Sequence, residues 1–105
     1  MGIYTRLAKI DEIEENKVKV VETKYFRIGI TKYKDEFFAF EDVCSHDGGI
    51  ISKGEVADCM ITCPRHNATF GLKDGKPLCM PATSPIPVFN VRTLGEFIEV
   101  ELEDD

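Results

Sequence analysis

Hydrophobic and polar side chains alternate along several short segments of the chain, which is the pattern of β-strands with one buried face. Residues 17–22 place valines on one face and lysines on the other. Residues 25–33 place three apolar side chains on one face, namely Phe26, Ile28 and Ile30. Both segments are therefore predicted to be amphipathic strands.

The later segments continue the same pattern between turn-forming residues. Lys34-Asp35 and Leu94-Gly95 are the expected turns of an antiparallel meander and of a hairpin. The strands that they join, and one further strand, are expected at residues 36–40, 59–63, 86–93 and 96–102. Residues 8–15 are compatible with one short helical turn, and five prolines disfavour long helices in the second half. The prediction is an all-β chain, folded as an antiparallel β-sandwich or incomplete barrel.

Length and charge restrict the class of protein. With 105 residues the chain suits one domain, and we expect it to act as a monomer. Its net charge of −6 argues against nucleic acid or an anionic membrane as the partner, because both attract cationic surfaces. The chain shows no signal peptide and no apolar run of membrane-spanning length, which predicts a cytoplasmic protein. In that reducing compartment its four cysteines are expected to be metal ligands or buried thiols.

The alternation stops in residues 42–83, where Gly, Pro, Cys and His are frequent. Both histidines of the chain lie here, each just after a cysteine. His46 follows Cys44 by two residues, and His66 follows Cys63 by three. An irregular segment of this length inside a small domain usually has a function of its own. The paired spacing points to a metal site.

Two cysteines and two histidines suit a [2Fe–2S] cluster with mixed ligands. Two thiolates hold one iron, and two neutral imidazoles hold the other. One cysteine and one histidine from each of two facing loops would clasp the cluster. A structural zinc site is the alternative, because the same four side chains make a tetrahedral set. The common zinc arrangement pairs like with like, however, and that favours iron–sulfur.

The motifs Cys44-Ser45-His46-Asp47-Gly48-Gly49 and Cys63-Pro64-Arg65-His66 resemble the two ligand boxes of Rieske proteins. The chain is most similar in kind to stand-alone Rieske-type ferredoxins, such as those of bacterial ring-hydroxylating dioxygenase systems. The likeness continues through Phe70, Gly75, Pro81-Ala82 and residues 86–91. It implies one Rieske-type domain over residues 1–105, with a small cluster-binding subdomain at about residues 42–83 inserted in the β-scaffold.

The resemblance implies the function as well. The ligands of the [2Fe–2S] cluster would be Cys44, His46, Cys63 and His66. The protein would carry one electron from a reductase, expected to be flavin-dependent, to a terminal oxygenase or another redox enzyme. It would perform no substrate chemistry itself. Two alternatives stay open: a small subunit of a reductase complex, as in nitrite reductase, and a structural zinc module.

The other two cysteines are not expected to bind the metal. Cys59 lies in a predicted strand, where a small buried hydrophobic residue is the usual role of a thiol. Cys79 lies near the loop containing Pro81, which matches the proline loop that covers the cluster in the family. Neither a Cys59–Cys79 disulfide nor a fifth ligand is expected.

Several positions differ from the Rieske subunits of respiratory and photosynthetic complexes. Gly49 and Arg65 occupy the positions of two cysteines that form a disulfide between the loops in those proteins. Ala68 and Phe70 stand where those proteins have Ser and Tyr hydroxyls near the sulfur atoms. Asn67 stands where many relatives have Gly, and Asn is one of the few residues that adopt a left-handed backbone.

These differences predict a low reduction potential. Hydrogen bonds to the sulfur atoms stabilise the reduced cluster, so their loss lowers the potential. We expect a value of about −150 mV, at the low end of the Rieske range. A potentiometric titration monitored by the visible absorbance measures it. A clearly positive potential would contradict this interpretation.

Overall fold

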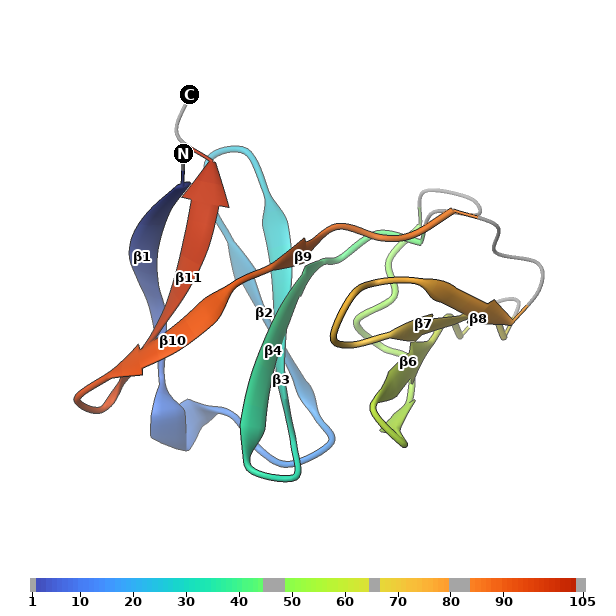
Figure 1. The fold of residues 1–105 in the computed structure, drawn as a ribbon, viewed down its shortest axis with the longest axis horizontal. Helices are drawn as coiled ribbons and strands as arrows, with labels where there is room; N and C mark the ends of the chain where they lie inside the picture. Colours follow the sequence, from blue (N-terminus) through green and yellow to red (C-terminus); the bar gives the residue numbers. More distant parts are fainter. Residues whose placement is uncertain (1, 45–48, 65–66, 80–83, 104–105) are drawn as a thin grey trace.

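The computed structural model describes residues 2–44, 49–64, 67–79 and 84–103. In these ranges the chain forms three β-sheets, and every pair of named strands is antiparallel. Two sheets form a sandwich, and the third lies beside it (Figure 1). The predicted all-β class is confirmed. No helix in the described ranges is long and apolar enough to cross a membrane.

The first sheet has the strand order β1-β11-β10. Its strands are β1 (Gly2–Lys9), β10 (Val91–Leu94) and β11 (Phe97–Glu103). Leu94 pairs with Phe97, so the hairpin turn has two residues. Gly95 is the first of them and has a φ of 61°, which a type II′ turn requires and glycine adopts without strain. The predicted hairpin is present, but its turn is Gly95-Glu96 and not Leu94-Gly95. The strand expected at residues 86–93 is divided into β9 and β10, which belong to different sheets.

The second sheet has the order β2-β3-β4-β9. Its strands are β2 (Val18–Glu22), β3 (Arg27–Tyr33), β4 (Glu36–Glu41) and β9 (Val88–Phe89). Lys34 and Asp35, with φ values of 50° and 64°, form the turn between β3 and β4. Positive φ at both central residues is the geometry of a type I′ hairpin turn. The predicted meander is therefore present.

The third sheet lies inside the segment that the sequence marked as irregular. It has the order β5-β6-β7-β8. Its strands are β5 (Val56–Ala57), β6 (Met60–Thr62), β7 (Thr69–Gly71) and β8 (Pro77–Cys79). These strands have only two or three residues each, which is too short for alternation to be recognised.

The predicted strand position of Cys59 was wrong, because this residue lies in a turn. Asp58 and Cys59 have φ values of 52° and 60°, and they form the turn that joins β5 to β6. Cys59 is therefore half-buried in a turn, and the strand begins at Met60. The pairing of Ala57 with Met60 requires this turn, although cysteine has no preference for a positive φ.

The N-terminal segment also differs from the prediction. Strand β1 was not predicted, since several exposed positions interrupt its alternation. The expected helical turn over residues 8–15 shrinks to the 3₁₀ helix η1 (Ile10–Glu12). The backbone N–H of Lys9 donates to the Glu12 carboxylate over 2.8 Å at its start. Pairing of β1 with β11 thus extends the strand further than the local pattern indicated.

Strand β4 separates two hydrophobic cores. The sandwich core lies between the first two sheets and consists of Ala8, Ile13, Ile28, Ile30, Ala39, Ile98, Val100 and Leu102. The second core, called the cysteine core below, consists of Phe38, Phe40, Cys44, Ile51, Val56, Ile61, Cys63, Ala68, Phe70, Leu72 and Ile86. Successive side chains of a strand point to opposite faces, so β4 contributes Ala39 to the first core and Phe38 and Phe40 to the second. The third sheet is thereby packed against the sandwich (Figure 1).

Candidate metal centre

Two cysteines begin loops that are closed in the same way. The backbone N–H of Cys44 donates to the carbonyl of Gly49 over 2.7 Å, and that of Cys63 donates to the carbonyl of Ala68 over 2.6 Å. In both loops the acceptor lies five residues after the cysteine. The two loops are thus closed by the same backbone hydrogen bond, although their sequences differ.

The predicted histidines belong to these same two loops in the sequence. His46 lies between Cys44 and Gly49, and His66 between Cys63 and Ala68. Both histidines are outside the described residues. Each closed loop therefore contains one thiol whose position is described and one histidine placed by sequence alone.

The two loops are attached to the scaffold differently. The first follows β4 and leads to β5, and these strands belong to different sheets. The second joins β6 to β7, which pair directly through Thr62 and Thr69. In the second loop Asn67 has a φ of 59°, and its N–H donates to the carbonyl of Cys63 over 3.0 Å. The expected left-handed conformation of Asn67 is confirmed.

The thiols of both loops are fully buried in one core. Cys44 and Cys63 are 0% exposed, and Ala68 and Phe70 beside them are also 0% exposed. No disulfide joins Cys44, Cys59 and Cys63 to one another. Ala68 and Phe70 have no hydroxyl group, and the low reduction potential that follows from this stays a prediction.

The described part of the donor set fits a mixed cysteine–histidine centre. Among the described residues, no group of three or more His, Cys, Asp and Glu side chains lies close enough to hold a metal. The parts of the two cysteine loops that are not described each contain one histidine. Two thiols and two imidazoles are the donors of a Rieske centre.

A buried carboxylate holds the first loop in place, and the sequence alone did not point to it. The Asp42 side chain is 0% exposed. Its Oδ1 accepts hydrogen bonds from the backbone N–H groups of Ile51 and Ser52 over 2.9 and 2.7 Å. Its Oδ2 accepts one from Nε of Arg27 over 2.8 Å. The position of an acidic residue two before Cys44 was the available signal, but its partners lie far away in the sequence.

A glycine fixes the segment that returns from the site to the sandwich. Gly75 has a φ of 74°, and an added Cβ would lie 2.1 Å from the carbonyl oxygen of Ile86. The N–H of Ile86 donates to the carbonyl of Gly75 over 2.9 Å. A side chain at this position would separate the two segments. The close approach therefore explains why glycine stands here.

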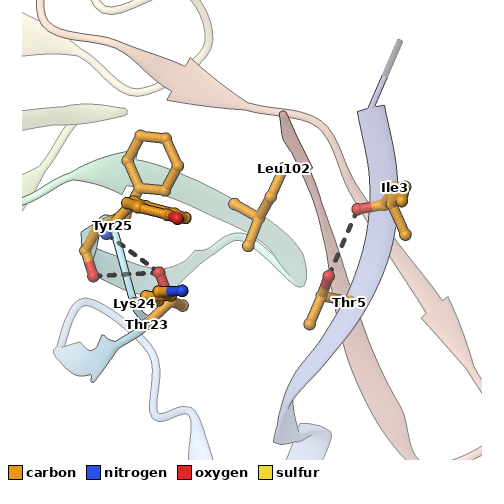
Figure 2. Close-up of a pocket in the computed structure, with 7 residues that line it drawn as sticks. Ile3, Thr5, Thr23, Lys24, Tyr25 and Leu102 are labelled. Atoms are coloured by element: carbon orange, nitrogen blue, oxygen red, sulfur yellow. Dashed lines mark hydrogen bonds between the residues drawn. The ribbon is translucent and has the colours of Figure 1, made fainter. Parts of the chain in front are cut away.

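A hollow elsewhere on the chain has a different character. It has a volume of about 190 Å³ and lies at the seam of the sandwich, away from both cysteines. Figure 2 shows Tyr25 and Lys24 on one side, Ile3 and Thr5 on the other, and Leu102 between them. Lys24 is its only charged lining residue. It contains no acid–base pair and no thiol, so it is not part of the metal centre.

Comparison with known families decides the class of the centre. The model of the Rieske [2Fe–2S] domain matches residues 4–90, a range that includes both cysteine loops. The chain belongs to the Rieske [2Fe–2S] domain family. Its cofactor is accordingly a [2Fe–2S] cluster, and the resemblance seen in the sequence is confirmed.

Proteins of similar sequence or similar fold cover most of the chain. The anthranilate 1,2-dioxygenase ferredoxin subunit of Burkholderia cepacia is 32% identical over 96 residues, covering 91% of this chain and 89% of the relative. A ferredoxin of Sphingomonas yanoikuyae B1 has the same fold, with a TM-score of 0.90 at 18% identity, covering 96% of this chain and all of that one. A chain in the complex of reduced oxygenase and oxidized ferredoxin of carbazole 1,9a-dioxygenase has a TM-score of 0.88 at 25% identity, covering 93% and 92%.

The left-handed conformation of Asn67 predicts the effect of two substitutions. Asn67→Gly should be tolerated, whereas Asn67→Val should lower the free energy of unfolding by about 1–2 kcal/mol, because a β-branched residue is strained at positive φ. Asn16, with a φ of 61° in the scaffold, is the matched control. Asn16→Val should cost a similar amount in chemical denaturation, but only Asn67→Val should also reduce the visible absorbance of the cluster per protein. Equal absorbance in both variants would contradict the role of Asn67 in the ligand loop.

Proposed function

We propose that the chain is a one-electron carrier whose cluster is held by Cys44, His46, Cys63 and His66. The observation that carries the proposal is that the N–H of each cysteine closes its loop in the same way, with both thiols buried in one core. When bound, the cluster accepts and releases one electron. The two buried cysteines would hold one iron, and the two histidines would supply the ligands of the other.

Within the single domain of residues 1–105, we assign cluster binding to a subdomain at about residues 42–83. The third sheet and most of the cysteine core come from this segment, which supports the assignment. Phe38, Phe40 and Ile86 join that core from the scaffold. The scaffold thus supplies a fixed wall against which the two loops fold.

The proposed acceptor is a terminal oxygenase, and the proposed donor is a flavin-dependent reductase. The Burkholderia relative is named as a ferredoxin subunit of a dioxygenase, and the carbazole dioxygenase neighbour is a complex of oxygenase and ferredoxin. The carrier itself performs no substrate chemistry. We further propose that it works as a monomer in the cytoplasm. The net charge of −6 disfavours nucleic acid and anionic membrane surfaces as partners.

Several exposed apolar residues lie close in sequence to the two cysteine loops or to the undescribed residues 80–83, and they suit a transient interface. Ile50, beside the first loop, is 39% exposed, and Leu78 on β8 is 55% exposed. Pro64 and Pro85, which flank the undescribed segments, are exposed as well. These four residues carry no charge. We propose that they form a small apolar docking surface, which fits the weak, short-lived contact of redox partners.

EPR spectroscopy of the reduced protein tests the proposed ligand set. Dithionite-reduced wild-type protein should give a Rieske-type spectrum, because two imidazole ligands on one iron make that spectrum differ from the all-cysteine form. His46→Ala and His66→Ala should each abolish it. Iron analysis and colour supply the control, since a zinc protein would be colourless. An all-sulfur spectrum, or full folding without iron, would refute the proposal, and stable co-purification with a large catalytic subunit would favour the reductase-subunit alternative.

The proposed docking surface of Ile50, Pro64, Leu78 and Pro85 predicts that the same substitution at two equally exposed leucines changes the electron-transfer rate unequally. Leu78 and Leu94 are both 55% exposed, but Leu94 lies at the β10–β11 turn of the first sheet. Leu78→Glu should slow reduction of the oxygenase component of the Burkholderia relative's dioxygenase by about tenfold, because it places a charge in an apolar contact. Leu94→Glu should leave the rate within about twofold. Stopped-flow absorbance measures both rates, and equal rates for the two variants would place the docking surface elsewhere.

A further inference from the structure

The first ligand loop lacks the support that the second loop has. The second loop closes a hairpin, so the ladder between β6 and β7 fixes both of its ends. The first loop connects β4 to β5, which lie in different sheets and do not pair. When no ladder of strand hydrogen bonds holds the ends of a loop, other interactions must hold them, because a cluster ligand must stay in a fixed place.

Hydrogen bonds to the Asp42 side chain hold the two ends of the first loop together. It lies two residues before Cys44, and its Oδ1 accepts the N–H groups of Ile51 and Ser52, which lie beyond the end of the loop at Gly49. One carboxylate oxygen therefore joins the entry of the loop to its exit. The charge also makes these hydrogen bonds stronger than those of a neutral acceptor.

Arg27 links Asp42 to the β-scaffold. Its Nε donates to Oδ2 of Asp42 over 2.8 Å, and its backbone carbonyl accepts the N–H of Asp42 over 2.7 Å. Arg27 is the first residue of β3, and its Nη1 also donates to Glu22 of β2 over 3.2 Å. A fully buried carboxylate is costly unless it is paired and hydrogen-bonded. Here all three donors are present.

We propose that Asp42 and Arg27 are positioning residues for the iron–sulfur cluster. This inference rests on the proposed ligand role of Cys44. Asp42 closes the first loop around the cysteine, and Arg27 fixes the closed loop to β3 while it neutralises the buried carboxylate. Neither residue ligates the metal. Their pairing across 15 residues of sequence sets where the thiol of Cys44 meets the cluster.

The same pair affects the added electron through its charge. A negative charge close to the cluster disfavours reduction, and a positive charge favours it. Removing the carboxylate of Asp42 should therefore raise the reduction potential, whereas removing the guanidinium of Arg27 should lower it. Arg27 is 41% exposed, so water screens its charge and its shift should be the smaller of the two. A merely structural defect would not produce shifts of opposite sign.

The test compares Asp42→Asn, Arg27→Met and the double variant with wild-type holoprotein. Asn keeps an oxygen for the two amides but cannot accept the hydrogen bond of Arg27. We expect iron release to a chelator to be about tenfold faster in each single variant, with potentials shifted in opposite directions. The double variant should have a potential nearer that of wild type, because both charges are gone. Arg27→Lys, which keeps the charge, should restore most of the wild-type behaviour.

Arg92 and Glu99 provide the matched control. Their ion pair, 2.7 Å long, lies on β10 and β11 of the first sheet, and Glu99 is 10% exposed. Arg92→Met should lower the free energy of unfolding but leave the potential, the EPR spectrum and the rate of iron release unchanged. If Asp42→Asn does not accumulate, comparison of Arg27→Met with Arg27→Lys decides the question.

Two results would overturn the inference alone. One is a set of Arg27 and Asp42 variants that release iron no faster than Arg92→Met. The other is a shift of both single-variant potentials in the same direction. Both presuppose a wild-type protein with a normal Rieske EPR spectrum. A wild-type protein without that spectrum would instead refute the proposed function itself.

Discussion

The backbone hydrogen bond that closes each cysteine loop is the constraint on which the site depends. Cys44 and Cys63 each donate their N–H to a carbonyl five residues later, so each thiol is fixed at the start of a small closed ring. A cluster bridging two loops can be held only if both loops keep their shape and their separation. The rest of the structure supplies the shape through hydrogen bonds and the separation through the packing of one core.

Strand β4 links the third sheet to the sandwich, because it packs against both. Its alternate residues belong to two cores, with Ala39 in the sandwich core and Phe38 and Phe40 in the cysteine core. Movement of the third sheet would therefore expose apolar surface on one face of β4, at a cost of about 25 cal/mol for each Å². The first ligand loop begins directly after this strand, and the buried Asp42–Arg27 pair fixes that junction. Packing and charge thus act at the same point of the chain.

Most of the scaffold could be predicted from local pattern, with a few exceptions. The meander of β2, β3 and β4 and the hairpin of β10 and β11 follow from alternation and from the turn residues Lys34, Asp35 and Gly95. Strand β1 was missed because its pairing with β11 at the other end of the chain makes it a strand. In the third sheet β6 was predicted within residues 59–63, whereas β5, β7 and β8 were missed because two or three residues are too few for alternation to be recognised. Cys59 was predicted in a strand because its neighbours in the sequence favour one. The pairing of β5 with β6 instead requires a turn at this residue.

The sequence by itself indicated a [2Fe–2S] centre, because residue type and spacing are local properties of the two motifs around Cys44 and Cys63, and the family match confirms that cofactor. It also showed that Asn67 could adopt its left-handed conformation, since asparagine accepts a positive φ more readily than most residues. Only the tertiary structure decided how the loops are held. Gly2 pairs with Glu103 across the whole chain, and Arg27 meets Asp42 from another strand. Such contacts depend on how distant segments pack, and no local pattern of residues specifies them.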